Sequence, residues 1–328
     1  MSVLTPASLP AFADLIANDI QNIYVKRSDR IAQMEKYFNV GMTNSYYQKD
    51  SSVTGVGKSK FVGMNASVQY DAPLQGFDKT YTQKKYAHGI EIDEQCWKYG
   101  INYRKITNIV ETLADGDIDK IEEDAADMLN NGYSTSYSDS EKQTISTAGG
   151  DSAAYFTASH TREDGGTAWN NIVYDGTTYN MDFEYDALKA LRKTAAAVVG
   201  PRGQQLNSMP DTIVAKTGSS VQDRYEELLA NFSKNAMPGG NDNDGTAKVG
   251  LPKAIFLKDL DNDAYWFAFD SSKKNDVYGL QWLWSEKPHM LAPEIVYDTQ
   301  LYKRQSIMFY DRGGNDMRYW YASNGTNT

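Results

Sequence analysis

An apolar stripe between residues 103 and 131 defines the longest element of this 328-residue chain. Apolar side chains recur there every three or four residues, which is the period of one helix face. Such a helix is roughly 40 Å long, so its apolar side needs an equally long surface to pack against. The stripe consists of Ile106, Ile109, Val110, Leu113, Ile121, Ala125, Met128 and Leu129.

The other side of this helix is strongly acidic between Asp115 and Asp127. A run of carboxylates on one helix face is usually solvated. Acid–base catalysis instead needs carboxylates whose pKa values have been shifted apart by burial. We therefore expect a solvated face and no catalytic pair. Gly132 is expected to end the helix.

Helical spacing also extends over the N-terminal part of the chain. It predicts a long amphipathic arm from about Pro10 to Val40, ended by Gly41. An arm of this kind packs either on its own domain or on a neighbouring subunit.

Residues 42–80 have a different composition, with scattered Gly, Ser, Thr and Tyr and few apolar residues for a core. Alternation at Lys60–Val62 and Ser67–Tyr70 predicts two strands of a long hairpin or extended loop. A loop of this length without its own core is usually functional or disordered. We expect something outside the loop to hold it, and a strand from Thr80 to Ile92 to follow it.

The second half of the chain alternates between helical and strand patterns, and its tail alternates between apolar and polar residues. The Gly-rich segment Gly313–Asp316 predicts a hairpin turn within that tail. The expected helices are 184–199 and 220–236, the expected strands are 212–215, 254–257 and 264–269, and the alternating tail is 295–323.

The composition argues against several classes of protein. The chain has 43 acidic and 33 basic residues, a net charge of −10, which disfavours a surface that binds nucleic acid throughout. The single cysteine, Cys96, excludes an intrachain disulfide framework. The longest apolar run, Ala264–Phe269, is too short to cross a membrane, and the N-terminus lacks the pattern of a signal peptide.

No catalytic motif is complete. Gly55–Ser59 resembles the end of a phosphate-binding loop, but Ser52 occupies the place of the first glycine and no helix is expected to follow. His160 has no cysteine nearby and no recognisable acidic partner in the sequence. We therefore predict that the protein is not an enzyme and needs no cofactor.

The calcium-loop pattern is incomplete as well. Asp259, Asp261 and Asp263 have the required spacing, but Ala264 replaces the glycine that the sharp turn of such a loop needs. We predict an acidic turn between two strands and no metal site.

The order of these elements resembles the major capsid protein of a tailed bacteriophage, which has the Hong Kong 97-type fold. The shared order is a helical arm, an extended loop, a strand ending at Ala87–Ile92, a long helix, a central α/β region and a terminal strand pair. The second half further resembles Mu-like major head subunits, whereas the first half matches by element order only. The Mu-like segments include Tyr155–His160, Met209–Val214, Leu257–Leu260, Ala264–Phe267 and Arg312–Arg318.

The resemblance implies an α+β fold of four parts. These are an N-terminal helical arm (1–41), an extended loop (42–80), a peripheral domain with the long spine helix (81–135 and 295–328), and a central axial domain (136–294).

It also implies a major capsid protein that self-assembles, as hexamers and pentamers, into an icosahedral shell around double-stranded DNA. The other partners would be a portal and separate scaffold or decoration proteins, with no membrane involved. Assembly would take place in the host cytoplasm, and the protein would end in the virion.

Two sets of residues follow from this interpretation. The extended loop would contact a neighbouring subunit through Lys58, Lys60, Phe61 and Tyr70. Bases on the arm would face inward and contact DNA phosphates without sequence preference; these are Lys26, Arg27 and Arg30. A covalent link from Lys58 or Lys60 to Asn315 or Asn324 is conceivable but not expected.

Two alternatives remain. An encapsulin-type nanocompartment would share the fold and hold cargo enzyme, although the Mu-like second half counts against it. An aromatic-rich ligand-binding module would use Trp266, Trp282 and Trp284 as a stacking platform. These tryptophans lie in strand-like runs, which favours core packing instead.

Overall fold

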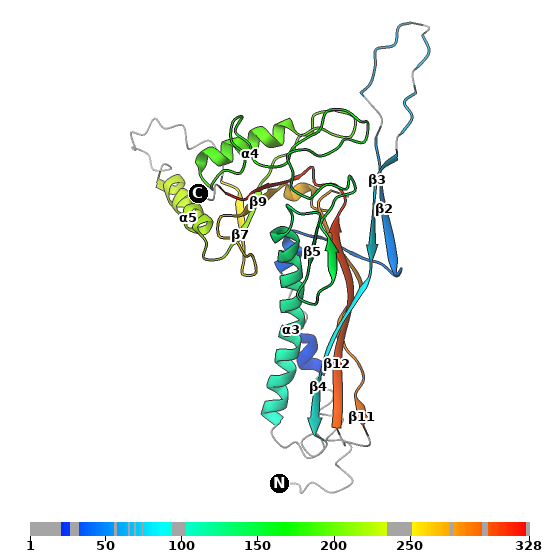
Figure 1. Cartoon of the computed structure of the whole chain (residues 1–328), viewed down its shortest axis with the longest axis vertical. Helices are drawn as coiled ribbons and strands as arrows, with labels where there is room; N and C mark the ends of the chain where they lie inside the picture. Colours follow the sequence, from blue (N-terminus) through cyan, green and yellow to red (C-terminus); the bar gives the residue numbers. More distant parts are fainter. Residues whose placement is uncertain are drawn as a thin grey trace.

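The described residues form an elongated α+β structure with two large sheets and two two-stranded hairpins, one of which projects (Figure 1). Helix α3 (Tyr103–Asn130) runs alongside a long sheet. Helices α4 (Tyr185–Ala197) and α5 (Ser220–Lys234) lie with a second sheet at one end of the unit that α3 and the long sheet form. The computed structural model describes residues 21–26, 33–55, 58–64, 66–68, 70–73, 75–93, 103–234, 251–275, 278–296 and 301–325.

The long sheet is built around β12 (Leu301–Gly314), which lies between β10 (Leu280–Met290) and β4 (Lys84–Asp93). All of these pairs are antiparallel. A short strand, β11 (Glu294–Val296), also pairs with β12. The edge strand β1 (Asn39–Met42) is parallel to β10.

Helix α3 lies on this sheet and buries seven of the eight residues of the predicted apolar stripe, among them Leu113, Ile121 and Met128. The eighth, Ile109, is 43% exposed. The prediction for its acidic side is wrong at two positions. Asp117 is 2% exposed and Asp124 is fully buried. The two carboxylates alternate with the buried apolar residues at three- and four-residue spacing, so they face the sheet and not solvent.

The carboxylate of Asp124 forms the centre of a buried polar network between α3 and β12. Its Oδ2 lies 2.7 Å from Nη1 of Arg312 and accepts a hydrogen bond of 2.6 Å from the Tyr310 hydroxyl. Its Oδ1 lies 3.1 Å from Nζ of Lys120. Burial nevertheless raises the pKa of Asp124, and these three groups oppose that shift.

A second buried carboxylate, Asp117, lies about two turns nearer the N-terminal end of α3 and contacts three elements. Its Oδ2 accepts a 2.5 Å hydrogen bond from the hydroxyl of Tyr24, in the helical segment 21–26. Its Oδ1 lies 3.1 Å from Oγ of Ser306 on β12 and 3.1 Å from Nδ1 of His88 on β4. Asp117 therefore attaches the N-terminal segment to the helix and the sheet.

The second sheet has the strand order β13-β9-β7-β8. Its core lies between the sheet and the helices, with Trp266 and Ile213 buried beside Leu188 and Leu191 of α4. The predicted helices and strands of this half are confirmed within a few residues. The strands are β7 (Thr212–Lys216), β8 (Lys253–Leu257), β9 (Trp266–Phe269) and β13 (Trp320–Ser323).

The predicted hairpin of the tail is wrong. After β12 the chain leaves the long sheet, and β13 pairs with β9 in the second sheet. Trp320 stacks on Phe269 with ring centroids 4.6 Å apart. Local alternation predicts both strands, but these long-range contacts decide which sheet each strand joins.

The prediction of one helix as far as Val40 is also wrong. The described part of this region contains helical residues 21–26, a short 3-10 helix η2 (Gln33–Lys36) and then β1. Val40 pairs with Trp282 of β10, and Phe38 packs edge-on against the same tryptophan at 5.6 Å. Sheet pairing and aromatic packing override the helical periodicity here.

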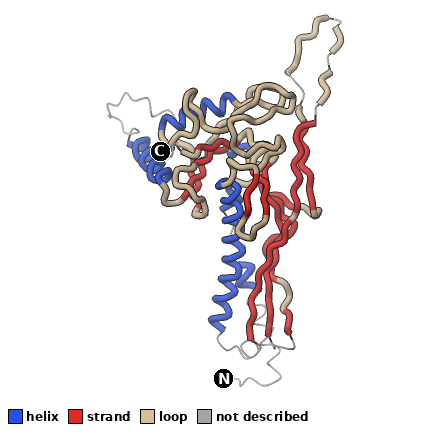
Figure 2. The backbone as a smooth tube through the Cα atoms, in the orientation of Figure 1, coloured by secondary structure: helices blue, strands red, loops and turns tan. Residues whose placement is uncertain are grey.

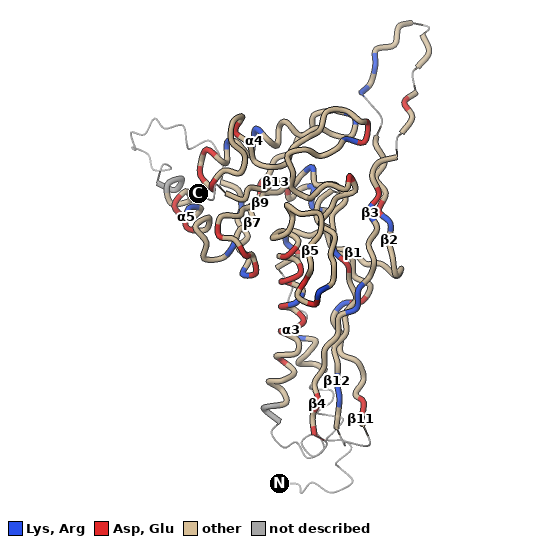
Figure 3. The backbone as a smooth tube through the Cα atoms, viewed as in Figure 1, with Lys and Arg blue, Asp and Glu red and all other residues tan. Residues whose placement is uncertain are grey.

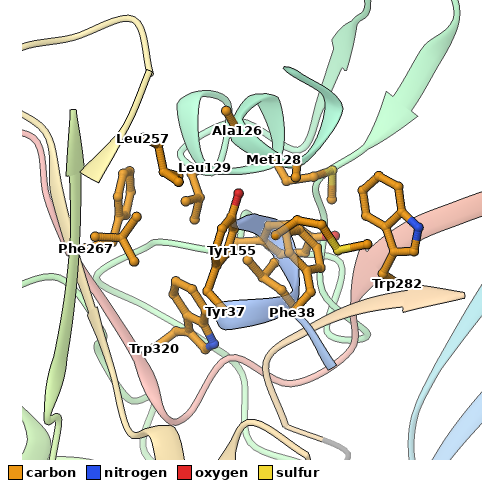
Figure 4. Close-up of a cluster of buried hydrophobic side chains, with 14 of the residues drawn as sticks. Tyr37, Phe38, Ala126, Met128, Leu129, Tyr155, Leu257, Phe267, Trp282 and Trp320 are labelled. Carbon is orange, nitrogen blue, oxygen red and sulfur yellow. The ribbon is translucent and has the colours of Figure 1, made fainter. Parts of the chain in front are cut away.

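One large hydrophobic cluster joins both sheets to the C-terminal end of α3 (Figure 4). Met128 and Leu129 of α3 meet Trp282 of the long sheet and Phe267 of the second sheet in this cluster. Two strands of a small hairpin, β5 (Ser136–Ser138) and β6 (Thr144–Ser146), lie beside α3. Another short 3-10 helix, η4 (Ser271–Lys273), follows β9.

Removing the Asp124 carboxylate should strongly destabilise the fold. Asp124→Ala leaves the 1%-exposed guanidinium of Arg312 buried without its main partner, and we expect a loss of about 3–5 kcal/mol in the free energy of unfolding. Urea denaturation measures it. The matched control is Asp119→Ala on the same helix, whose 63%-exposed carboxylate pairs with Lys258, and it should cost less than about 1 kcal/mol. If Asp124→Ala and Asp119→Ala lost the same free energy of unfolding, the buried network around Asp124 would not stabilise the fold as expected.

The contact between His88 and Asp117 should make stability depend on pH. The hydrogen bond to Asp117 raises the pKa of His88, against the opposing effect of burial. A raised folded-state pKa adds stability below the ordinary histidine value, and this stability disappears as pH rises through the raised value. His88→Gln should therefore lose more stability relative to wild type at about pH 5.5 than at about pH 8.5.

Thermal or urea unfolding at the two pH values measures this difference. His289→Gln, at a half-exposed histidine on β10, is the matched control. If the difference in stability between His88→Gln and wild type were the same at both pH values, protonation of His88 would not be coupled to folding.

Candidate subunit-contact surface

The extended loop predicted from the sequence is an antiparallel hairpin with a long tip (Figure 2). Strand β2 (Tyr47–Val53) pairs with β3 (Gln75–Thr82), and β3 continues into β4 after Gln83. The strand predicted from Thr80 to Ile92 is thus confirmed with one interruption. The strands predicted at 60–62 and 67–70 are wrong, because the described residues there form no strand.

The base of the hairpin belongs to the core of its own chain. Tyr81 is fully buried. The carboxylate of Asp50 accepts hydrogen bonds from Gln281, at 3.5 Å, and Asn315, at 3.4 Å. Lys79 donates a 2.6 Å hydrogen bond to the carbonyl of Ala148. The base of the hairpin is therefore held by the rest of its own chain.

Most of the exposed large apolar side chains that the structure describes lie in the loop. Among the described residues, fourteen large apolar side chains are exposed, and nine of them lie between residues 42 and 70. Phe61 is 98% exposed and Tyr70 is 93% exposed. Apolar residues gathered on one exposed segment are typical of a surface that another molecule covers. The nine are Met42, Tyr46, Tyr47, Val53, Phe61, Val62, Met64, Val68 and Tyr70.

The four predicted contact residues, Lys58, Lys60, Phe61 and Tyr70, all lie on this tip. Nζ of Lys60 lies 3.8 Å from the carboxylate of Asp71, across the tip.

The returning limb of the tip is attached to the rest of the subunit by Arg202. Its guanidinium donates a hydrogen bond to the carbonyl of Ala72, and Nη1 lies 4.0 Å from the carboxylate of Asp71. The tip is therefore anchored on one side while its aromatic side chains stay exposed.

The predicted basic residues of the arm are only partly described. Lys26 is exposed at the end of the helical segment 21–26. Arg27 and Arg30 lie outside the described residues.

The predicted partners for a covalent link are not both accessible. Asn315 is buried under the hairpin, where it also donates to the carbonyl of Phe77, and Asn324 is partly buried. The stacking platform of tryptophans is wrong as well. Trp266, Trp282 and Trp284 are all buried in the two cores, where no ligand can stack on them.

Sequence reasoning missed the partner of His160. Its Nδ1 lies 2.9 Å from the carboxylate of Asp151, its Nε2 lies 3.2 Å from Oδ1 of Asn171, and its ring stacks on Trp169 at 4.1 Å. Asp151, His160 and Trp169 line a cavity of about 10 Å³, which is room for one water molecule. The two hydrogen bonds and the ring stack hold the segment between Asp151 and Asn171 together.

Arg318 closes the same region from the tail. Its guanidinium forms a paired contact with the Glu163 carboxylate at 2.6 and 3.0 Å, lies next to Asp316, and covers the ring of Trp169 at 5.2 Å. No spacing in the sequence indicates these partners, because residues 163 and 318 are far apart along the chain.

The acidic turn between β8 and β9 uses its charges in ion pairs. Asp263 lies 2.7 Å from Lys216. Within the described residues, no three or more His, Cys, Asp or Glu side chains are grouped as metal ligands. No helix in the described part of the chain has the length and apolarity to cross a membrane.

No family model matches the chain, and no curated protein matches it by sequence. Solved structures do match. The capsid of Cyanophage P-SCSP1u is 11% identical, with 90% of this chain and 88% of that chain covered and a TM-score of 0.50. A chain of Mycobacterium phage Adephagia (11% identical, 90% and 91% covered) and one from the capsid of a native GTA particle (12%, 90% and 90%) both have TM-scores of 0.49. The match to the cyanophage capsid shows that this chain has the fold of a phage capsid protein.

Removing the two most exposed aromatic rings of the tip should weaken self-association without unfolding the subunit. We expect Phe61→Ser with Tyr70→Ser to raise the association midpoint concentration at least about tenfold, while the free energy of unfolding changes by less than about 0.5 kcal/mol. Light scattering and urea denaturation measure the two quantities.

The matched control is Met209→Ser with Leu229→Ser, two exposed apolar side chains outside the loop. It should leave association unchanged. If the two double variants associate equally well, the loop is not the contact surface.

Proposed function

We propose that this chain is the major capsid protein of a tailed phage, of the Hong Kong 97 type and close to Mu-like head subunits. Copies of it assemble, as hexamers and pentamers, into an icosahedral shell around a double-stranded DNA genome. The observation that carries the proposal is the exposed apolar tip on a subunit with a capsid fold. The protein has a structural role in the virion and no enzymatic one.

The tip supports assembly because its exposed apolar surface is costly in a free monomer. Hydrophobic burial contributes about 25 cal/mol per Å², so covering several large side chains favours association. The hairpin also projects well beyond the rest of the subunit (Figure 1). A projecting apolar segment on a rigid base can lie on an adjacent copy, whereas it adds nothing to a monomer.

The four-part division belongs to this proposal: arm 1–41, extended loop 42–80, peripheral domain 81–135 with 295–328, and axial domain 136–294. In this division the long sheet would belong to the peripheral domain and the second sheet to the axial domain. β10 joins the long sheet from the axial interval, and β13 joins the second sheet from the terminal interval.

The DNA would be contained and not bound tightly. A subunit with a net charge of −10 repels phosphates on average. Contacts with the genome therefore depend on local bases such as Lys26, and they would be non-specific and weakened by salt. A portal and separate scaffold or decoration proteins complete the set of partners, and assembly takes place in the host cytoplasm.

Purification of the full chain tests the proposal directly. We expect the protein to elute at megadalton mass in size exclusion, and negative-stain micrographs to show closed shells or rings of capsomers. The Phe61→Ser, Tyr70→Ser variant should elute at the monomer mass of 36.7 kDa. Elution of the wild-type protein as a monomer over a wide range of concentration and salt would refute the proposal.

A further inference from the structure

The imidazole ring of His160 is buried between two hydrogen-bond acceptors. Its side chain is 2% exposed. Nδ1 lies 2.9 Å from Oδ2 of Asp151, and Nε2 lies 3.2 Å from Oδ1 of Asn171. A neutral imidazole has one N–H group and one bare nitrogen, so it donates to only one of these oxygens. The other contact then brings two lone pairs together.

The orientation of the Asn171 amide is fixed by the backbone around it. Its Oδ1 accepts a 3.0 Å hydrogen bond from the N–H of Thr157, and its Nδ2 donates a 2.7 Å hydrogen bond to the carbonyl of Tyr155. An exchange of the oxygen and the nitrogen would place donor against donor and acceptor against acceptor at these two contacts. Because Asn171 is fully buried, that conflict would be costly. Oδ1 therefore faces Nε2 of His160 as an acceptor.

The side chain of Asp151 is held as an ionised acceptor. Its Oδ1 accepts a 3.2 Å hydrogen bond from the N–H of Ala153, and the N–H of Thr161 also donates to the carboxylate. Burial opposes ionisation of Asp151, but the contact with His160 and these backbone hydrogen bonds outweigh it and lower the pKa of the carboxyl group. Both nitrogens of His160 thus face acceptors, and a ring that donates from both nitrogens is an imidazolium cation.

The charges around His160 also favour a cation. Charged residues lie along most of the described chain (Figure 3), but here they are removed from solvent. Glu163 and Asp316 both pair with Arg318 on the tail. These three side chains and that of Asp151 are each at most 12% exposed. With a neutral His160, three buried carboxylates would share one guanidinium.

The other neighbours of His160 are compatible with a positive charge on the ring. The ring stacks on Trp169 at 4.1 Å, and an aromatic face attracts a cation. On the same loop, Arg162 is paired with Asp164. From the hairpin base, two uncharged side chains line the adjoining cavity, Ser52 and Phe77.

The buried ring links two parts of the molecule. On one side, Asp151 lies in the turn whose Gly150 N–H donates a 2.9 Å hydrogen bond to the carbonyl of Asn315. The side chain of Asn315 in turn contacts the base of the hairpin. On the other side, the carbonyl of Asn171 accepts a 3.1 Å hydrogen bond from the N–H of Ala322 on β13. The contacts of the ring therefore connect the hairpin base to the second sheet.

We propose that His160 is an imidazolium ion in the folded subunit, and that its second proton clamps residues 151–171 between the hairpin base and the second sheet. Loss of this proton as pH rises removes one hydrogen bond and leaves two lone pairs in contact, so the segment opens locally. The clamp is therefore closed at low pH and its stabilising effect is lost as pH rises. The inference concerns a single subunit and goes beyond the proposed function.

The protonation state of the ring tests the first part of the proposal. Magic-angle-spinning NMR of the full chain, isotope-labelled at the histidine nitrogens, counts the N–H groups on each ring and works for particles of any mass. The chain has three histidines, and His88→Gln and His289→Gln identify the signals of the other two. We expect two N–H groups on His160 at about pH 7.5, where an ordinary histidine is mostly neutral. A ring with one N–H group at this pH in the folded wild-type chain would show that the proposal is wrong.

Hydrogen exchange of backbone amides tests the clamp. The N–H groups of His160 and Trp169 donate to each other's carbonyls at 2.8 and 3.1 Å. Their protection should fall at least about tenfold between about pH 6 and about pH 9, after correction for the intrinsic exchange rate. The amides of β7, in the core of the second sheet, should lose less than about threefold.

Asp151→Asn is the matched variant. Its amide donates to Nδ1, so a neutral ring that donates from Nε2 to Asn171 fits without conflict. Protection of the same two amides should then change less than about threefold over this pH range. The control, Asp186→Asn, changes a 74%-exposed carboxylate on α4 and should behave like wild type.

Two outcomes would overturn the clamp. One is wild-type protection that does not depend on pH, and the other is an equal dependence in Asp151→Asn and wild type. Neither measurement depends on assembly, so the capsid proposal stands or falls separately.

Discussion

The buried ion pair between Asp124 and Arg312 fixes how the long helix lies on the long sheet. Two charges removed from water are costly unless they meet with good geometry and further hydrogen bonds. Here Tyr310 and Lys120 also contact the carboxylate, and two more tyrosines accept from Arg312. A helix shifted by one turn would leave both charges unpaired. The register of α3 on β12 follows from this constraint.

Much of the fold can be predicted because periodicity is a local property. The stripe of α3, the helices α4 and α5, and the strands β7 and β8 all appear where the pattern places them. Asp117 and Asp124 were assigned to a solvated face because the acidic run masks their positions within the apolar stripe. β13 was assigned to a hairpin because alternation does not specify the partner strand.

The candidate contact surface was predictable for a different reason. A long segment with few apolar residues cannot form its own core, so its exposure follows from composition. Its attachment did not follow, because Asp50 meets Asn315 across 265 positions of the sequence. The pairing of His160 with Asp151 also depends on a chain path that no motif encodes. The sequence thus identified the segment, and the tertiary contacts showed which of its apolar side chains stay exposed.

The passage of the chain from β9 to β10, and back from β12 to β13, has a mechanical consequence. The two sheets are not joined by a single linker, because the chain crosses between them twice. It passes from β9 in the second sheet to β10 in the long sheet, and from β12 in the long sheet to β13 in the second sheet. A tensile load across the subunit acts on paired strands and on the shared aromatic cluster around Trp282 and Phe267, instead of on a compliant linker. The chain should therefore move as one rigid body, and curvature in any larger assembly would have to arise at the interfaces between copies.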